Sequence, residues 1–127
     1  MSEQASEFGV VRLTAAGQAI ALRLAARGGR VSLWDDSFAA MERFALEHKG
    51  TRGGLVGYAD LADFFDSLEP AAAVVVSDSA DTEAAASAAQ WAGAGRRLIH
   101  IRGSDGPAGV DEAALRAIEA RLCGPGE

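Results

Sequence analysis

The sequence predicts an α/β fold, in which one parallel sheet of about five strands carries helices on both faces. Two observations support this class. Short apolar runs alternate with segments of helical periodicity along the chain, and the run 71–77 is apolar without interruption, as in a strand that is covered on both faces. The crossovers are expected to be right-handed. The predicted arrangement is doubly wound, with three layers and the strand order 3-2-1-4-5.

The first third of the chain reads as a strand, a helix and a second strand. A short apolar run that ends near Arg12 forms the first strand. The segment 14–27 follows with apolar residues at helical spacing, and the pair Gly28-Gly29 closes this helix. The segment 30–34 is the second predicted strand.

A second helix is predicted over 36–50, where either Asp36 or Ser37 can cap its start and Gly50 can end it. Its apolar residues share one face: Phe38, Met41, Phe44 and Ala45. A weak third strand follows at 54–58. These elements continue the alternation of strands and helices.

A short third helix is predicted over 60–70, with Asp60 as its N-cap and Pro70 as its stop. Its inward residues are Leu61, Phe64, Phe65 and Leu68. The remaining elements are strand 71–77, helix 81–95, strand 96–101 and helix 110–122. The stretch 103–109 is interpreted as a flexible connection, and the inward face of the last helix comprises Ala114, Leu115, Ile118 and Leu122.

The totals indicate one domain, 1–127, with a flexible start at 1–7 and a flexible tail at 123–127. The net charge of −6 argues against binding to nucleic acid or to an anionic membrane. Cys123 is the single cysteine, which excludes an internal disulfide and a cysteine metal site. The polar N-terminus lacks the apolar core of a signal peptide, and no apolar run approaches the roughly 18 residues of a spanning helix. We expect a soluble cytoplasmic protein.

The turn after the first strand has the layout of a phosphate-binding turn, whose three glycines allow a tight turn, close approach of pyrophosphate and close helix packing. The frame here is R-L-T-A-A-G. Only the packing glycine is present, as Gly17, while Arg12 and Thr14 replace the other two. The crevice positions of this turn are Arg12, Leu13, Thr14, Ala15, Ala16 and Gly17.

An acid after the second strand is the other half of a dinucleotide fingerprint. Asp35 lies near the place, about 20 residues further on, where an acid binds the ribose hydroxyl. An equal alternative is that Asp35 and Asp36 only cap the next helix. The sequence leaves both interpretations open.

With these residues in view, the chain resembles the N-terminal coenzyme domain of 6-phosphogluconate dehydrogenase and the related 3-hydroxyacid dehydrogenases. The resemblance runs from Phe8 to about Ser104. The segment 17–37 is similar to the family's G-Q-N-L-A-L-N-x-A-x-x-G-x-x-V-x-V-Y-N-R-T. The segment 47–77 is similar to the family's connection between second helix and fourth strand, including the pair Phe64-Phe65. The resemblance implies a Rossmann-like NAD(P)-binding fold.

The departures from this family fall where its ligands bind. Its phosphate turn is G-L-A-x-M-G, and its N-R-T, whose arginine holds the 2′-phosphate of NADP, is Asp35-Asp36-Ser37 here. Its M-V-K-A-G loop is V-S-D-S-A, so Ser77 and Asp78 join the crevice positions, with Asp78 in place of the lysine. Its D-G-G-N is approximately H-I-R-G-S. The resemblance does not extend to the family's helical C-terminal domain, which supplies the catalytic lysine, most substrate contacts and much of the dimer interface.

These replacements predict a vestigial crevice. The Arg12 side chain would occupy the place of the pyrophosphate, or lie across an empty crevice and pair with Asp35 or Asp78. Acids at the mouth disfavour a pyrophosphate dianion. We therefore expect no tightly bound cofactor, and NAD is favoured over NADP because an acid accepts from a 2′-hydroxyl.

Three functions remain open. The leading hypothesis is a degenerate coenzyme domain without dehydrogenase activity, which acts as a homodimer or with an unidentified protein partner. The second is an NAD(P)-binding oxidoreductase component that meets its substrate with another chain. The third is a binding module for another nucleotide or metabolite at the strand ends. No catalytic residue is predicted, and His48 and His100 have no metal-ligand spacing.

Overall fold

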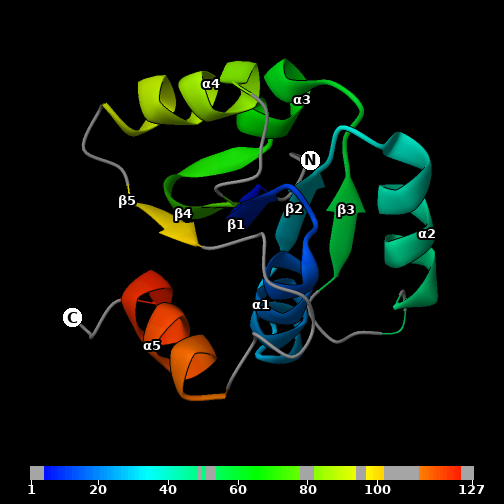
Figure 1. Ribbon diagram of the computed structural model, residues 1–127, viewed down its shortest axis with the longest axis vertical. Helices are drawn as coiled ribbons and strands as arrows, with labels where there is room; N and C mark the ends of the chain where they lie inside the picture. Colours follow the sequence, from blue (N-terminus) through cyan, green and yellow to red (C-terminus); the bar gives the residue numbers. More distant parts are fainter. Residues whose placement is uncertain are drawn as a thin grey trace.

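The computed structural model describes residues 5–48, 50, 54–77, 82–93, 97–101 and 112–123. Its centre is a five-stranded parallel sheet in the order β3-β2-β1-β4-β5, which Figure 1 shows nearly edge-on. The strands are β1 (Ser6–Val11), β2 (Val31–Trp34), β3 (Leu55–Gly57), β4 (Leu68–Ser77) and β5 (Arg97–Ile101). This arrangement confirms the predicted Rossmann-like α/β fold and its strand order.

Helices cover both faces of the sheet. They are α1 (Ala15–Ala26), α2 (Phe38–Glu47), α3 (Leu61–Asp66), α4 (Thr82–Ala92) and α5 (Glu112–Cys123). In Figure 1, α3 and α4 lie above the sheet, α1 and α5 lie below it, and α2 lies beside the edge strand β3. None of the helices within the described ranges is long and apolar enough to cross a membrane.

The core has two parts because neighbouring residues of a strand face opposite sides. Val10 and Val75 belong to the cluster that packs against α1 and α2. Val11 and Val76 belong to the cluster on the other face, together with Phe64 of α3. The uninterrupted apolar run of β4 therefore fills both layers, as the sequence predicts.

Both ends of α1 are formed by local signals. The Thr14 hydroxyl caps the helix and accepts from the Gly17 backbone N–H at 3.2 Å. At the other end, Gly28 adopts a φ of +99°, which favours glycine. The Gly29 N–H then donates to the Leu24 carbonyl at 3.1 Å. The predicted closure of α1 at Gly28-Gly29 is confirmed.

The last helix, α5, packs against α1. Glu119 of α5 forms ion pairs with Arg23 and Arg27 of α1, each with a nitrogen–oxygen distance of 3.1 Å. Ile118 is half-buried against the core on this face. These contacts hold α5 against α1, in agreement with the predicted final helix. The side chains of the other residues predicted to face inward, Ala114, Leu115 and Leu122, are not among those that the structure describes.

The prediction for the end of α3 is wrong. The helix ends at Asp66 with Ser67 as its C-cap, and Leu68 and Pro70 belong to β4 rather than to the helix. The pairing of β1 with β4 is irregular between Ser6 and Phe8, where extra residues of β4 bulge from the ladder. A proline fits such a bulge because its missing N–H is not needed for the ladder.

The expected inward position of Phe38 is also wrong. Met41 and Phe44 are buried, whereas Phe38 is 47% exposed. Helix α2 packs on the core through Met41 and Phe44, and its first residue, Phe38, lies outside this contact.

The first strand starts at Ser6, within the segment 1–7 that the sequence predicts to be flexible. Ser6 is only 1% exposed, and its N–H donates to the Ser67 carbonyl at 2.7 Å. Its hydroxyl oxygen lies 2.6 Å from that of Ser32, which lies 2.6 Å from that of Ser67. Hydrogen bonds among these three hydroxyl groups hold the start of β1 in place. The hydrophobic pattern of the sequence does not reveal such a network.

Replacement of Gly17 by alanine is expected to destabilise the domain by about 1–3 kcal/mol, the usual cost of overpacking. A Cβ at this position would lie 2.6 Å from the backbone carbonyl oxygen of Arg12, which cannot rotate away. Gly50→Ala is the matched control, because a Cβ there meets nothing within 4 Å. Urea unfolding measures both variants, and equal stability of the two would contradict the close approach.

Candidate functional site

The candidate site lies at the carboxyl ends of β1 and β2, where open α/β sheets bind ligands. The turn 12–14 connects β1 to α1, and the segment 35–37 connects β2 to α2. The parallel pairing of Val11 with Trp34 brings these two connections together. The parallel pairing therefore brings residues from two segments that are remote in the sequence together at the carboxyl edge of the sheet.

The backbone of Arg12 retains the shape of a glycine turn. Its φ is +78°, in the left-handed region that side chains disfavour. The Arg12 N–H donates to the Trp34 carbonyl at 2.7 Å and so extends the pairing of β1 with β2. The turn keeps its tight geometry although an arginine occupies it.

The Arg12 side chain reaches across to both acids that follow β2. Its Nη1 lies 3.4 Å from Oδ1 of Asp35 and also contacts Oδ1 of Asp36. The Asp35 side chain is 9% exposed, whereas those of Arg12 and Asp36 are 33% and 43% exposed. The expected pairing of Arg12 with Asp35 is present and includes Asp36, while Asp78 lies outside the described residues.

The two carboxyl groups differ in proton affinity. Burial raises the pKa of Asp35 to about 6, helped by a hydrogen bond to Asp36 and opposed by the charge of Arg12. The pKa of Asp36 is lowered, first by the hydrogen bond from Asp35 and then by Arg12. When protonated, Asp35 donates to the Asp36 carboxylate, which pairs with Arg12.

The first turn of α1 is partly occupied by its own residues. The Gly17 N–H, one of the donors that a phosphate would use, already donates to the Thr14 hydroxyl. The Leu13 carbonyl accepts from Nε2 of Gln18 at 3.0 Å, and the Leu13 side chain is buried. Ala15 and Ala16 begin α1, and their side chains lie outside the description.

The cap role of Thr14 was missed by sequence reasoning, although a threonine before an alanine-rich helix is a typical N-cap signal. Ser37, not Asp36, caps α2 by accepting from the Ala40 N–H at 3.3 Å. The interpretation of Asp36 as a cap is therefore wrong. Ser77 ends β4 opposite Ile101 of β5, and its side chain is not described.

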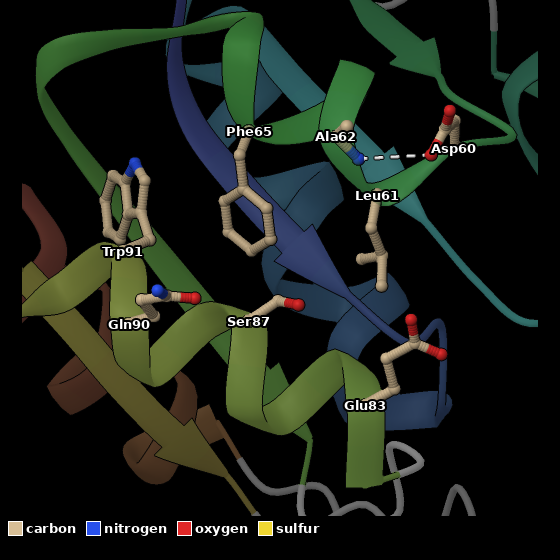
Figure 2. A pocket seen from close by; sticks show the side chains of 8 residues that line it. All are labelled: Asp60, Leu61, Ala62, Phe65, Glu83, Ser87, Gln90 and Trp91. Carbon is tan, nitrogen blue, oxygen red and sulfur yellow. Dashed lines mark hydrogen bonds between the residues drawn. The ribbon is translucent and has the colours of Figure 1, made fainter.

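A second concave feature lies between α3 and α4, and sequence reasoning missed it. Figure 2 shows this pocket, whose volume is about 460 Å³. Its lining residues come from both helices: Asp60, Leu61, Ala62, Phe65, Glu83, Ser87, Gln90 and Trp91. Trp91 is half-buried in this wall.

No group of three potential metal ligands forms within the described ranges. The His48 ring lies against Phe44, with ring centroids 4.9 Å apart. His100 belongs to β5, and its side chain is not described. The geometry thus points to the crevice of Arg12 and to the α3/α4 pocket.

Several solved structures share this fold. An imine reductase from Aspergillus terreus in complex with NADPH4 and dibenz[c,e]azepine matches 94% of this chain and 37% of its own, with 14% identity and a TM-score of 0.54. Glycerol-3-phosphate dehydrogenase from Coxiella burnetii matches 94% of this chain and 38% of its own, with 18% identity and a TM-score of 0.57. A reductive aminase from Aspergillus terreus in complex with NADPH and ethyl-5-oxohexanoate matches 93% and 53%, with 14% identity and a TM-score of 0.50.

These likenesses define the class of the domain as a Rossmann-like α/β domain, a fold that it shares with this imine reductase, this dehydrogenase and this reductive aminase. At such low identity they show the fold alone. The chain spans from 37% to 53% of the length of these structures. No family model and no curated protein matches the sequence, so the resemblance to 6-phosphogluconate dehydrogenase stays a prediction.

The raised pKa of Asp35 predicts that its contribution to stability falls as the pH rises from about 4 to about 6. The folded state binds the proton more tightly than the unfolded chain, so the contribution is complete below pH 3.8 and is lost through the folded pKa. Asp35→Asn removes this slope. Urea unfolding at several pH values measures it.

The control for this prediction is Asp66→Asn, which changes an exposed carboxyl group of α3 outside the cluster of Arg12, Asp35 and Asp36. It leaves the slope between pH 4 and 6 in place. A stability difference between wild type and Asp35→Asn that stays constant from pH 4 to 7 would contradict the raised pKa.

Proposed function

We propose that this chain is a degenerate NAD(P)-type domain that closes its phosphate crevice with its own side chains. It binds dinucleotides weakly, lacks dehydrogenase activity and acts through association with a second copy or another protein. The observation that carries the first half of this proposal is the Arg12 side chain, which spans from the phosphate turn to Asp35 and Asp36. The coarse class rests on the shared fold.

A pyrophosphate meets several costs at this crevice. It has to displace Arg12 from two acids that then face the ligand with negative charge. A pair of like charges about 4 Å apart costs roughly 1–4 kcal/mol between bulk water and a protein surface. The Thr14 hydroxyl also competes for the Gly17 N–H. Shape, charge and hydrogen bonding together support weak binding.

The same residues favour NAD over NADP where any dinucleotide binds. An ionised Asp35 accepts from a ribose 2′-hydroxyl, as acids at this position do in such domains. A 2′-phosphate would instead meet Asp36, whose lowered pKa keeps it charged. This preference is part of the proposal.

A second candidate is an NAD(P)-binding oxidoreductase component that meets its substrate together with another chain. The observation that favours it is that two of the similar structures are complexes with NADPH4 or NADPH. In this case the charge of Arg12 serves a phosphate instead of the two acids. The two candidates differ in the sign of the effect that removal of Arg12 has on dinucleotide affinity.

Association is supported by apolar surface on α2. Among the described residues, the exposed large hydrophobic side chains are Phe38, at 47%, and Leu46, at 62%. Helix α2 lies beside the edge strand β3. The proposal places the two-fold contact between copies on this helix.

The double variant Arg12→Gly with Thr14→Gly is expected to bind NAD about tenfold more tightly, a gain of about 1.4 kcal/mol. It removes the side chain that blocks the turn and frees the Gly17 N–H for phosphate. NADP gains less because Asp36 remains. Calorimetric titration measures both affinities, and thermal shift confirms that the variant is folded.

Arg12→Lys with Thr14→Ser is the matched control, because it keeps a long cation and a capping hydroxyl and should bind as weakly as wild type. Weaker binding by the glycine variant would show that Arg12 is a phosphate ligand. That result would replace the proposed function with the oxidoreductase candidate.

The wild-type chain is expected to sediment as a dimer at tens of micromolar, and Leu46→Glu is expected to sediment as a monomer. A carboxylate at the contact would be buried without a partner, which opposes association. Ala89→Glu, on exposed α4 surface, is the control and leaves the dimer intact. A monomeric wild type at this concentration would remove self-association from the proposal.

A further inference from the structure

We propose that the pocket between α3 and α4 binds a planar organic cation, such as an aromatic amidine or amine. The planar part of the ligand would pack against the aromatic rings of Phe65 and Trp91, and its cationic group would pair with the carboxylates of Asp60 and Glu83. The pocket volume of about 460 Å³ lies within the range of small-molecule sites, roughly 300–1,000 Å³.

The pocket has an apolar floor and an acidic rim. Leu61, Phe65 and Trp91 are half-buried, whereas Asp60 and Glu83 are exposed. Figure 2 shows α3 and α4 side by side, with the aromatic rings toward one end of the pocket and the two carboxyl groups toward the other. This separation matches a molecule that is apolar along one part and cationic at one end.

The charge of the rim is negative. Asp60 caps α3 and accepts from the Ala62 N–H at 3.2 Å, and Glu83 lies in the first turn of α4. A helix N-terminus carries at most about half a positive charge, so it only partly offsets a full carboxylate. Within the described ranges, the residues that line the pocket include no lysine, arginine or histidine. An anion is therefore disfavoured, and a cation is attracted.

The aromatic wall determines the shape of the ligand. The ring centroids of Phe65 and Trp91 lie 6.0 Å apart with an interplanar angle of 31°. A ligand ring stacked between these two rings would need more space than this distance leaves. The ligand therefore lies against the aromatic wall instead of between the rings. A cation near an indole face gains about 0.5–1 kcal/mol at an exposed site. The Ser87 hydroxyl and the Gln90 side-chain carbonyl can accept from its N–H groups.

The pocket is independent of the crevice at Arg12. None of the described residues that line it belongs to the turn 12–17 or to the segment 35–37. The proposal therefore does not rest on the proposed function, and either can fail without the other. A ligand here would also tie α3 to α4, which meet along this face.

Titrations of the full chain with three probes of the same shape test the charge preference. The probes are benzamidine, which is cationic, benzamide, which is neutral, and benzoate, which is anionic. Amide and indole N–H signals in heteronuclear NMR spectra report binding and its location. We expect saturable shifts in α3, α4 and the Trp91 indole, with affinity in the order benzamidine, benzamide, benzoate, and a decrease with added salt for benzamidine alone.

Two charge-neutral variants test the rim. Glu83→Gln and Asp60→Asn are each expected to weaken benzamidine binding by about threefold, the effect of an exposed charge pair, and to leave benzamide binding unchanged. Asparagine caps a helix as well as aspartate does, so Asp60→Asn keeps α3 folded. Glu42→Gln, on the exposed side of α2, is the matched control and leaves all affinities unchanged.

The proposal is overturned by equal binding of benzamidine and benzoate, by shifts that map outside α3 and α4, or by absence of binding. It is also overturned if Glu83→Gln and Asp60→Asn leave benzamidine affinity unchanged. Adenosine is included as a further probe. Tighter binding of adenosine with the same pattern of shifts would assign the pocket to a nucleoside instead of a cation.

Discussion

The arrangement of side chains at the carboxyl ends of β1 and β2 depends on the close contact between the first turn of α1 and the end of β1. At Gly17 even a methyl group would lie 2.6 Å from the Arg12 carbonyl oxygen. This approach keeps the turn tight, and Arg12 accepts a φ of +78° within it. The backbone geometry that folds the domain therefore also directs the Arg12 side chain toward the end of β2. The close packing at Gly17 and the position of the Arg12 charge therefore both follow from the geometry of this turn.

The crevice consequently contains a cluster of charged groups that pair with one another. One guanidinium group faces two carboxyl groups, and burial keeps Asp35 protonated up to a pKa of about 6. Below that pKa, a shared proton and one arginine satisfy this cluster without a ligand. A phosphate gains the attraction of Arg12 only by leaving the two acids exposed to it. For this reason the proposed weak binding of dinucleotides and the proposed preference for NAD rest on the same three residues.

Local signals predicted much of the fold because they act over a few residues. The glycine pair after α1, the Asp60 cap and the uninterrupted apolar run of β4 were all readable from the sequence. The errors arose where distant contacts overrode local preference. Pro70 reads as a helix stop, but it lies in β4 because a bulge against β1 accommodates it. Phe38 has the right spacing for a core residue, but its helix lies at the edge of the sheet.

The sequence by itself determined the strands and helices, the class of fold and the segments that form the crevice, because hydrophobic periodicity and turn residues encode these elements locally. Only the tertiary structure decided that Arg12 pairs with both Asp35 and Asp36, and that Thr14 caps α1. It also created the pocket between α3 and α4, whose walls are separated along the chain by β4. Such features depend on parallel strands that bring remote segments side by side, and no local pattern records which side chains then meet.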